Sequence, residues 1–412
     1  MLDLRDHFFV PDAPAVELRA FTHGLMPKTV PAMMERFVED WRERGVDAWN
    51  EVPNHWRPGS GEVVGWWTLP ETLGDAFIAP LLGAPAGTCI MQPNVHWTVQ
   101  CLLSAPEPFT AGRNEIVFSE GAFPSVQHSV YQWAAMQGLR PRPLPLGADG
   151  FVHVDAVLDA ISDRTAWVFL SHVGFTTGEK LPDAALHAVA EKAHRHDALF
   201  CIDGYHATGS VAVDVEALGA DVYVGGLLKE ACGSTGNSYL YVRDGLTLTP
   251  RLSGWFADAD PFGFQKQPQP HPDVRRRFLA GTTAIASLYH AVEGLRLLLD
   301  AGLENVRTDS LAKTALAIEQ AEAAGLTLQS PREAERRGAM VILAVKDAAA
   351  LCEWLKTQGV FTDSRQNRVL RLAPFVWNTT ADIERTFAVL EDGLKTNAHQ
   401  HVVAPASAGP VT

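Results

Sequence analysis

Two short apolar segments of this sequence each lead into a residue that can take part in catalysis. The first, residues 199–203, ends in Asp203 and is followed by His206. The second, residues 222–224, is followed by two glycines and then by Lys229. Short apolar runs of this kind predict buried strands, and open α/β sheets bind ligands at the carboxyl ends of their strands. Asp203 and Lys229 lie 26 positions apart, which is about the length of one strand-to-strand crossover.

An acid at the end of one strand and a lysine after the next suit pyridoxal phosphate. In such a site the lysine holds the cofactor as a Schiff base, and the acid pairs with the protonated pyridine nitrogen. The charged ring then withdraws electrons from the α-carbon of the substrate. The alternative is that Asp203 only caps a strand and that Lys229 is a solvated loop residue. The spacing alone leaves both interpretations open.

Other segments could complete a cofactor site at the same sheet edge. Residues 94–98 open an expected helix, whose N-terminus would offer free backbone N–H groups to a phosphate. Phe123 could stack on the cofactor ring, and Ser125 could reach the phosphate. Ser171 directly follows the apolar run 168–170, again at the end of an expected strand. Each signal is weak alone, but together they favour the cofactor hypothesis.

The elements that must position these residues alternate between strand and helix from residue 69 to about residue 299, which predicts a largely parallel sheet wrapped by helices. Strands are expected at 116–118, 167–170, 199–202 and 222–224, an antiparallel strand at 238–242, and helices at 126–137 and 184–196. Longer helices are expected at 288–301 and 310–323, followed by strands at 339–345 and 369–372 and helices at 348–355 and 380–394.

The domain organisation follows from this pattern. An N-terminal arm and a helix with an apolar stripe, residues 1–55, are expected to pack with the small domain. The large cofactor domain would span residues 56–300, and a smaller C-terminal domain residues 301–396. The tail from 397 to 412 is rich in Ala, Pro, Ser and Gly, and is expected to be disordered.

Composition narrows the classes of partner. The 412 residues carry a net charge of −14, which disfavours nucleic acid and anionic membranes. Five cysteines form no close pair, which argues against a disulfide framework or a zinc site, and no metal site is expected. No apolar run reaches the length of a membrane span, and the first residues lack the features of a signal peptide. We therefore expect a soluble, cytoplasmic protein.

The motifs add up to a resemblance to a known family. Residues 203–209 and 213–221, followed by Lys229, resemble the class V branch of fold-type I pyridoxal phosphate enzymes. Within that branch, residues 253–256, 277–282 and 371–374 look most like kynureninase. The resemblance spans about residues 20–395. It implies an α/β fold with a large domain, whose mainly parallel seven-stranded sheet is sandwiched by helices, and a smaller α+β C-terminal domain. It also implies a homodimer with active sites near the subunit interface.

The resemblance assigns roles to particular residues. Lys229, Asp203 and His206 would be catalytic: the lysine would hold the cofactor, the aspartate its pyridine nitrogen, and the histidine would lie beside the ring. Phe123 would stack on the ring, and Arg371 would clamp the substrate carboxylate, a task suited to a bidentate guanidinium. The phosphate would be bound by Val95, His96 and Ser125, and from a neighbouring subunit by Trp255 and Thr282.

Departures from the family pattern concern the reaction rather than the cofactor. Kynureninases usually have a tyrosine immediately before the lysine, and this chain has Leu228. A histidine that contacts the aromatic substrate is replaced near Asn50. We therefore expect a kynureninase-like lyase or hydrolase that cleaves a bond at the β-carbon of an amino acid. Its substrate specificity is expected to differ from that of kynureninase.

Other functions are consistent with the same cofactor-site motifs. A class V aminotransferase or epimerase and a non-catalytic interaction protein both remain open. A cysteine desulfurase is disfavoured because Cys352, the cysteine of the smaller domain, falls in a helical pattern rather than in a mobile loop.

Overall fold

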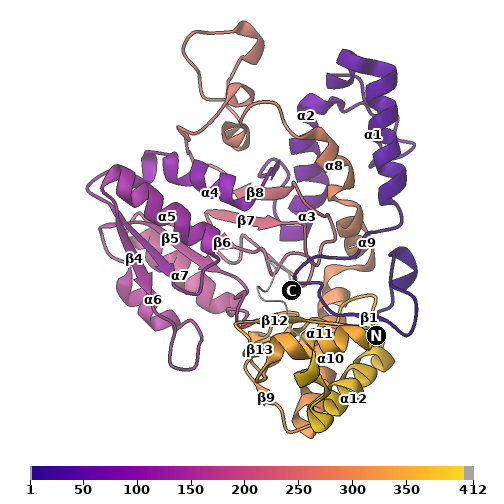
Figure 1. The fold of residues 1–412 in the computed structure, drawn as a ribbon. Helices are drawn as coiled ribbons and strands as arrows, with labels where there is room; N and C mark the ends of the chain where they lie inside the picture. Colours follow the sequence, from indigo (N-terminus) through magenta and orange to yellow (C-terminus); the bar gives the residue numbers. More distant parts are fainter. Residues whose placement is uncertain (1, 403–412) are drawn as a thin grey trace.

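The computed structural model describes residues 2–402, and they form a large domain with a central sheet and a smaller domain beside it (Figure 1). The sheet has the strand order β2-β8-β7-β6-β5-β3-β4. Its strands are β2 (Cys89–Gln92), β3 (Glu115–Ser119), β4 (Arg140–Leu144), β5 (Thr165–Ser171), β6 (Leu199–Asp203), β7 (Val222–Gly226) and β8 (Ser238–Val242). As predicted, β8 is antiparallel to its neighbours β7 and β2, whereas the pairs from β7 to β4 are parallel.

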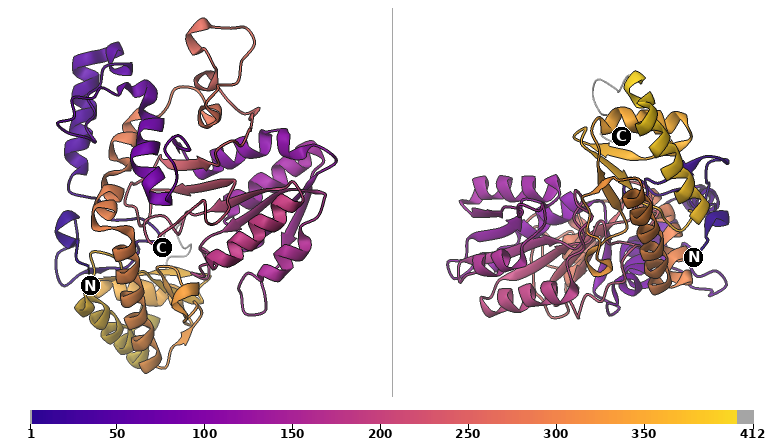
Figure 2. Two further views of the ribbon diagram at one scale, coloured as in Figure 1. Left: turned by 180° about the vertical axis from the view of Figure 1, so that it is seen from behind. Right: turned by 90° about the horizontal axis from the view of Figure 1, so that it is seen from below.

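Helices cover both faces of the large sheet (Figure 2). Alternating side chains of the strands pack against one helical layer or the other. In β3, Ile116 and Phe118 contact the helices α4 (Val95–Ser104) and α5 (Pro124–Gln137). Val117, between them, belongs to the opposite core with α6 (Val154–Ala160) and α7 (Asp183–Arg195). Because successive side chains of a strand point to opposite faces, both faces are apolar and covered. This is the expected mainly parallel sheet sandwiched by helices.

The small domain has its own sheet and core. Its antiparallel strands lie in the order β12 (Asp363–Arg365), β13 (Val369–Leu372), β10 (Val341–Ala344) and β9 (Thr327–Leu328). Three helices pack on this sheet or on one another: α10 (Leu303–Ala323), α11 (Ala348–Thr357) and α12 (Thr380–Thr396). Thr379 caps α12 by a reciprocal hydrogen-bond pair with Asp382, which explains where this helix begins.

The N-terminal segment divides between the two domains, which differs from the expectation that its helix packs with the small domain. Strand β1 (Val16–Glu17) pairs with β11 (Val360–Phe361) of the small domain. Helix α1 (Val30–Arg44), however, packs against α8 (Ile285–Ala291). The reason is a buried polar contact: Asp40 of α1 accepts hydrogen bonds from the Tyr289 hydroxyl at 2.7 Å and from His55 Nε2 at 2.7 Å.

Two further expectations need correction. The helix expected over 288–301 is interrupted at Val292, which separates α8 from α9 (Glu293–Ala301). In the tail, residues 398–401 form a short 3-10 helix, η9 (Ala398–His401). Its His399 is buried, and the ring Nδ1–H donates a hydrogen bond to the Gly393 carbonyl at 2.9 Å. Residues 403–412 of the expected disordered tail lie outside the described residues.

The remaining elements are short and surround the two sheets. They are η1 (Arg5–His7), η2 (Gly45–Trp49), α2 (Gly65–Leu73), η3 (Gly74–Ile78), α3 (Ala79–Leu82), η4 (Glu107–Phe109), η5 (Trp255–Ala257), η6 (Pro261–Gly263), η7 (Val274–Phe278) and η8 (Ala334–Arg336). Within residues 2–402, none of the helices has the length and apolar character needed to cross a membrane.

Candidate active site

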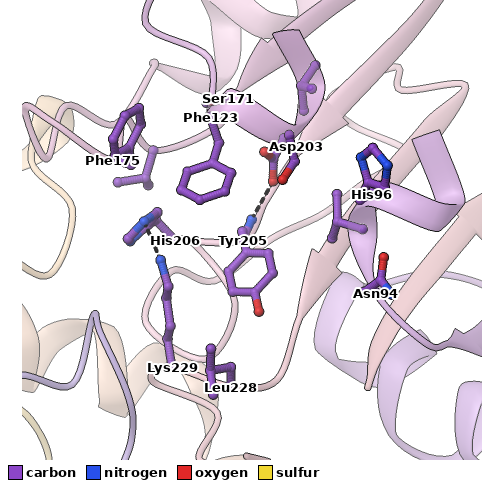
Figure 3. A pocket seen from close by; sticks show the side chains of 14 residues that line it. Asn94, His96, Phe123, Ser171, Phe175, Asp203, Tyr205, His206, Leu228 and Lys229 are labelled. Carbon is purple, nitrogen blue, oxygen red and sulfur yellow. Dashed lines mark hydrogen bonds between the residues drawn. The ribbon is translucent and has the colours of Figure 1, made fainter. Parts of the chain in front are cut away.

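A cavity of about 360 Å³ lies where strands β5, β6 and β7 end and helices α4 and α5 begin. It brings together eight of the residues that the sequence predicts for a cofactor site: Val95, His96, Phe123, Ser125, Ser171, Asp203, His206 and Lys229. Six more residues line it: Asn94, Val126, Val173, Phe175, Tyr205 and Leu228. Figure 3 shows how their side chains converge. A cavity of this size at the carboxyl edge of parallel strands is typical of a small-molecule site.

Asp203 presents a half-buried carboxylate to the cavity from the last position of β6. It is held between Ser171 of β5 and Val224 of β7, its partners in the two adjacent strands. Its Oδ1 accepts a hydrogen bond from the backbone N–H of Tyr205 at 3.0 Å. Desolvation raises the pKa of Asp203, and the hydrogen bond from Tyr205 and the charge of Lys229 offset this shift only in part. A cationic N–H donor in the cavity would satisfy it and favour its charged form.

Lys229 and His206 form a second polar pair across the cavity from Asp203. The lysine Nζ lies 2.6 Å from His206 Nε2. Burial lowers the pKa of Lys229 to about 8 and holds the pKa of His206 well below its usual value. A protonated Lys229 can only donate, so opposite it the Nε2 of a neutral imidazole would accept the hydrogen bond and Nδ1 would carry the proton. Within residues 2–402, that buried Nδ1 has no hydrogen-bond partner.

Residues at the N-termini of two helices, α4 and α5, line the cavity. Asn94 caps α4 by accepting a hydrogen bond from the Trp97 N–H at 2.8 Å. Phe123 is the N-cap residue of α5, and Ser125 lies in the first turn of that helix. His96 is anchored through its Nδ1, which lies 3.2 Å from the Ser129 hydroxyl. Helix N-termini favour anions, so this wall can hold a phosphate.

Comparisons with known proteins agree with this geometry. The family model described as "Aminotransferase class-V" matches residues 99–364. A protein from Bacillus subtilis named "Uncharacterized aminotransferase YcbU" is 30% identical over 77% of this chain and 82% of its own length. A kynureninase from Pseudomonas fluorescens is 30% identical over 89% of this chain and 86% of its own length. A kynureninase from Burkholderia pseudomallei is 28% identical over 96% and 92% of the two chains.

The chain belongs to the aminotransferase class-V family. The resemblance found in the sequence is thereby confirmed, and so is the fold-type I architecture. Solved structures share this fold at low identity. The cysteine desulfurase of Thermococcus onnurineus NA1 aligns with a TM-score of 0.76 and 18% identity over 93% of this chain and 95% of that one. Escherichia coli CsdA aligns with a TM-score of 0.76 and 18% identity over 95% and 98%.

The residues present fit pyridoxal phosphate, the cofactor that class V family members use. The Asp203 carboxylate, whose pKa is raised by desolvation, suits a protonated pyridine nitrogen, and a lysine with a lowered pKa suits a covalent link to an aldehyde. The N-termini of α4 and α5 suit the phosphate. Within residues 2–402, no group of His, Cys, Asp or Glu side chains could hold a metal ion.

Arg371 lies outside the cavity wall, and its guanidinium is already engaged. It is almost fully buried and makes a two-pronged contact with Asp363, from Nε at 3.2 Å and from Nη2 at 2.9 Å. Its Nη1 donates to the carbonyl of Phe175, a cavity residue, at 3.0 Å. The ring of Phe21 stacks under the guanidinium at 4.4 Å. The arginine therefore stands beside the site but faces a carboxylate of the protein itself.

Three other predicted residues are not brought to the cavity within this chain. Trp255 lies in an exposed aromatic cluster, where its ring stacks on Phe264. Thr282 is exposed in the same connection between β8 and α8. Asn50 is exposed at the end of η2. The positions of Trp255 and Thr282 are compatible with a role toward a neighbouring subunit, which stays a prediction.

Two residues that no functional expectation included lie close to Lys229. Tyr205 lines the cavity, and the Lys229 Nζ is 4.9 Å from the centre of its ring. Glu230 is fully buried, and within residues 2–402 neither carboxylate oxygen has a hydrogen-bond partner. Burial raises its pKa to about 7. In the sequence, only their closeness to Asp203, His206 and Lys229 could have indicated these two residues. Closeness in sequence does not show where a side chain points.

Proposed function

We propose that this class V protein is an enzyme that uses pyridoxal phosphate to act on an amino acid or an amino-acid-derived substrate. The observation that carries the proposal is the convergence of Asp203, His206 and Lys229 in one cavity. The cofactor, when bound, supplies an electron sink for charge that develops at the substrate α-carbon. Lys229 would bind it covalently, Asp203 would accept a hydrogen bond from its pyridine nitrogen, and Phe123 would pack on its ring.

Lys229 and His206 would then control proton transfer at the lysine amine. With its pKa lowered to about 8, Lys229 Nζ can both take up and release a proton near neutral pH. His206 Nε2 accepts a hydrogen bond from Nζ at 2.6 Å and so orients the amine. The apolar side chains of Val126, Val173 and Leu228 line the same cavity and limit the access of water.

For the reaction, we favour cleavage of a bond at the substrate β-carbon, as a kynureninase-like lyase or hydrolase with altered specificity. Kynureninases that are 28–30% identical along most of the chain support this choice. An aminotransferase or an epimerase is the second candidate. The similarity to the Bacillus subtilis protein named "Uncharacterized aminotransferase YcbU" supports the aminotransferase. Cys352 is buried in α11 beside the Thr362 hydroxyl at 3.1 Å, which argues against a nucleophilic cysteine there.

Arg371 is proposed to recognise the substrate carboxylate, for which it must loosen its contact with Asp363 or share its guanidinium. Since Asp363 already occupies two of its N–H groups, a substrate must share the guanidinium with Asp363 or displace it. Asn50 stays a proposed substrate contact. We further propose a homodimer in which Trp255 and Thr282 of one subunit reach the phosphate region of the other. The exposed aromatic side chains Trp255, Phe262 and Phe264 support this, because exposed apolar patches mark association surfaces.

The test is the absorption spectrum of the purified protein with pyridoxal phosphate, before and after a panel of amino acids that includes kynurenine. The wild-type protein should show a visible band that the Lys229→Ala variant lacks, and an unchanged band in that variant would contradict the assignment. A band that decays to a pyridoxamine-like species and stays there would indicate an aminotransferase. A band that returns while products accumulate would indicate a lyase or hydrolase.

A further inference from the structure

Tyr205 lines the cavity but has been given no role in binding or catalysis so far. Its backbone N–H donates to Asp203 Oδ1 at 3.0 Å, so the position of the tyrosine is tied to that carboxylate. Its ring lines the cavity and lies 4.9 Å from the Nζ of Lys229. Within residues 2–402, the hydroxyl makes no hydrogen bond. Tyr205 therefore contributes its aromatic ring to the cavity wall.

Phe123 presents its ring to the same cavity from the opposite side. Figure 3 shows the rings of Phe123 and Tyr205 on either side of an open space, with Asp203 at one end of it. Phe123 is held in place by an edge-to-face contact with Phe175, at 5.3 Å between ring centres. A flat heteroaromatic group that reached Asp203 with its ring nitrogen would lie between two aromatic side chains.

The backbone under Tyr205 is shaped for this ring. A Cβ atom at Gly226, the last residue of β7, would lie 2.4 Å from Cε2 and Cζ of Tyr205 and 2.7 Å from its hydroxyl oxygen. No side chain can occupy that position without displacing the Tyr205 ring, because atoms do not approach so closely. The absence of a side chain at Gly226 thus sets how far Tyr205 withdraws from the cavity.

We propose that Tyr205 is a binding residue for a planar heteroaromatic phosphate and forms, opposite Phe123, the second aromatic face of the site. This inference deepens the proposed function, on which it rests. Stacking of a heteroaromatic ring on one aromatic side chain corresponds to about a tenfold to hundredfold effect on affinity. Gly226 acts as a positioning residue that leaves room for the ring.

The experiment measures binding of pyridoxamine phosphate to the apoprotein by calorimetry. This probe has the ring and the phosphate but forms no covalent link with Lys229, so packing is measured directly. Tyr205→Ala should weaken its binding by about tenfold or more, whereas Tyr205→Phe, which keeps the ring, should stay within about twofold. Inorganic phosphate should bind the wild type and Tyr205→Ala equally, because the helix N-termini hold it.

A second variant tests the geometry without removing the tyrosine. Gly226→Ala should weaken pyridoxamine phosphate binding in the wild-type background and have little further effect in Tyr205→Ala. Unchanged affinity in Tyr205→Ala, a Tyr205→Phe variant as weak as Tyr205→Ala, or an equal effect of Gly226→Ala in both backgrounds would each overturn the inference. Failure of the wild type to bind pyridoxal phosphate at all would overturn the proposed function and this inference together.

Discussion

The buried ion pair between Arg371 and Asp363 predicts a large and asymmetric response to mutation. Asp363 is fully buried on β12 and accepts hydrogen bonds from three side chains. These are Arg371 through two N–H groups, Arg365 at 2.7 Å and the Thr22 hydroxyl at 3.0 Å. For Arg371, the other hydrogen bond that its guanidinium donates goes to the Phe175 carbonyl. The carboxylate therefore has more support than the guanidinium does.

Asp363→Asn removes the charge that compensates Arg371 and leaves its buried cation with neutral acceptors, the amide oxygen and the Phe175 carbonyl. Breaking a buried pair from one side costs about 3–5 kcal/mol of the free energy of unfolding. Arg371→Met leaves Asp363 with Arg365 and Thr22, so it should cost less, about 1–3 kcal/mol. The order of the two effects, Asp363→Asn above Arg371→Met, follows from the contacts alone.

The free energies can be measured by urea denaturation followed by tryptophan fluorescence, with hydrogen exchange of the β12 and β13 amides as a local readout. Glu39→Gln is the matched control, since it breaks an exposed pair with Arg36 at 3.7 Å and should change stability by less than about 0.5 kcal/mol. An Asp363→Asn variant as stable as this control, or one more stable than Arg371→Met, would refute the reasoning.

Two further predictions concern the lysine loop. Burial lowers the pKa of Lys229 to about 8, and the Glu230 carboxylate is the charge that most opposes this shift. Glu230→Gln should therefore move the pH midpoint for formation of the visible band with pyridoxal phosphate to lower pH; a midpoint that stays or rises would contradict this. Gly24→Ala should weaken both the fold and the band, because its Cβ would lie 2.2 Å from the Lys229 carbonyl oxygen. Gly281→Ala, where a Cβ would meet open space, is the control, and equal unfolding midpoints for the two variants would count against the packing argument.

Much of the fold and the centre of the site could be predicted from local sequence patterns. The short apolar runs that end at Ser171 and Asp203 became adjacent parallel strands, so their polar ends had to meet at one edge. Residues 94–98 predicted the start of a helix at the same edge, and α4 begins there. These inferences depend on the periodicity of strands and helices, which a single sequence records directly.

What could not be predicted depends on contacts between distant segments. The pattern around Arg371 is that of a carboxylate clamp, yet its partner Asp363 becomes visible only when β12 and β13 pair in their observed register. Tyr205 stood inside a recognised motif, but its place in the cavity depends on Gly226 in the next strand. In both cases the deciding contact joins residues whose relation no local pattern encodes.

The contacts of Arg371 also connect the small domain to the cofactor site. Its guanidinium joins Asp363 of the small-domain sheet to the carbonyl of Phe175, in the loop after β5. The Phe175 ring packs edge-to-face against Phe123, which lines the cavity. A carboxylate that competes with Asp363 for Arg371 would therefore act on a chain of contacts that ends at the proposed ring-binding wall. Substrate recognition and the position of Phe123 are expected to be coupled, because Arg371 bonds the backbone of Phe175, whose ring packs against Phe123.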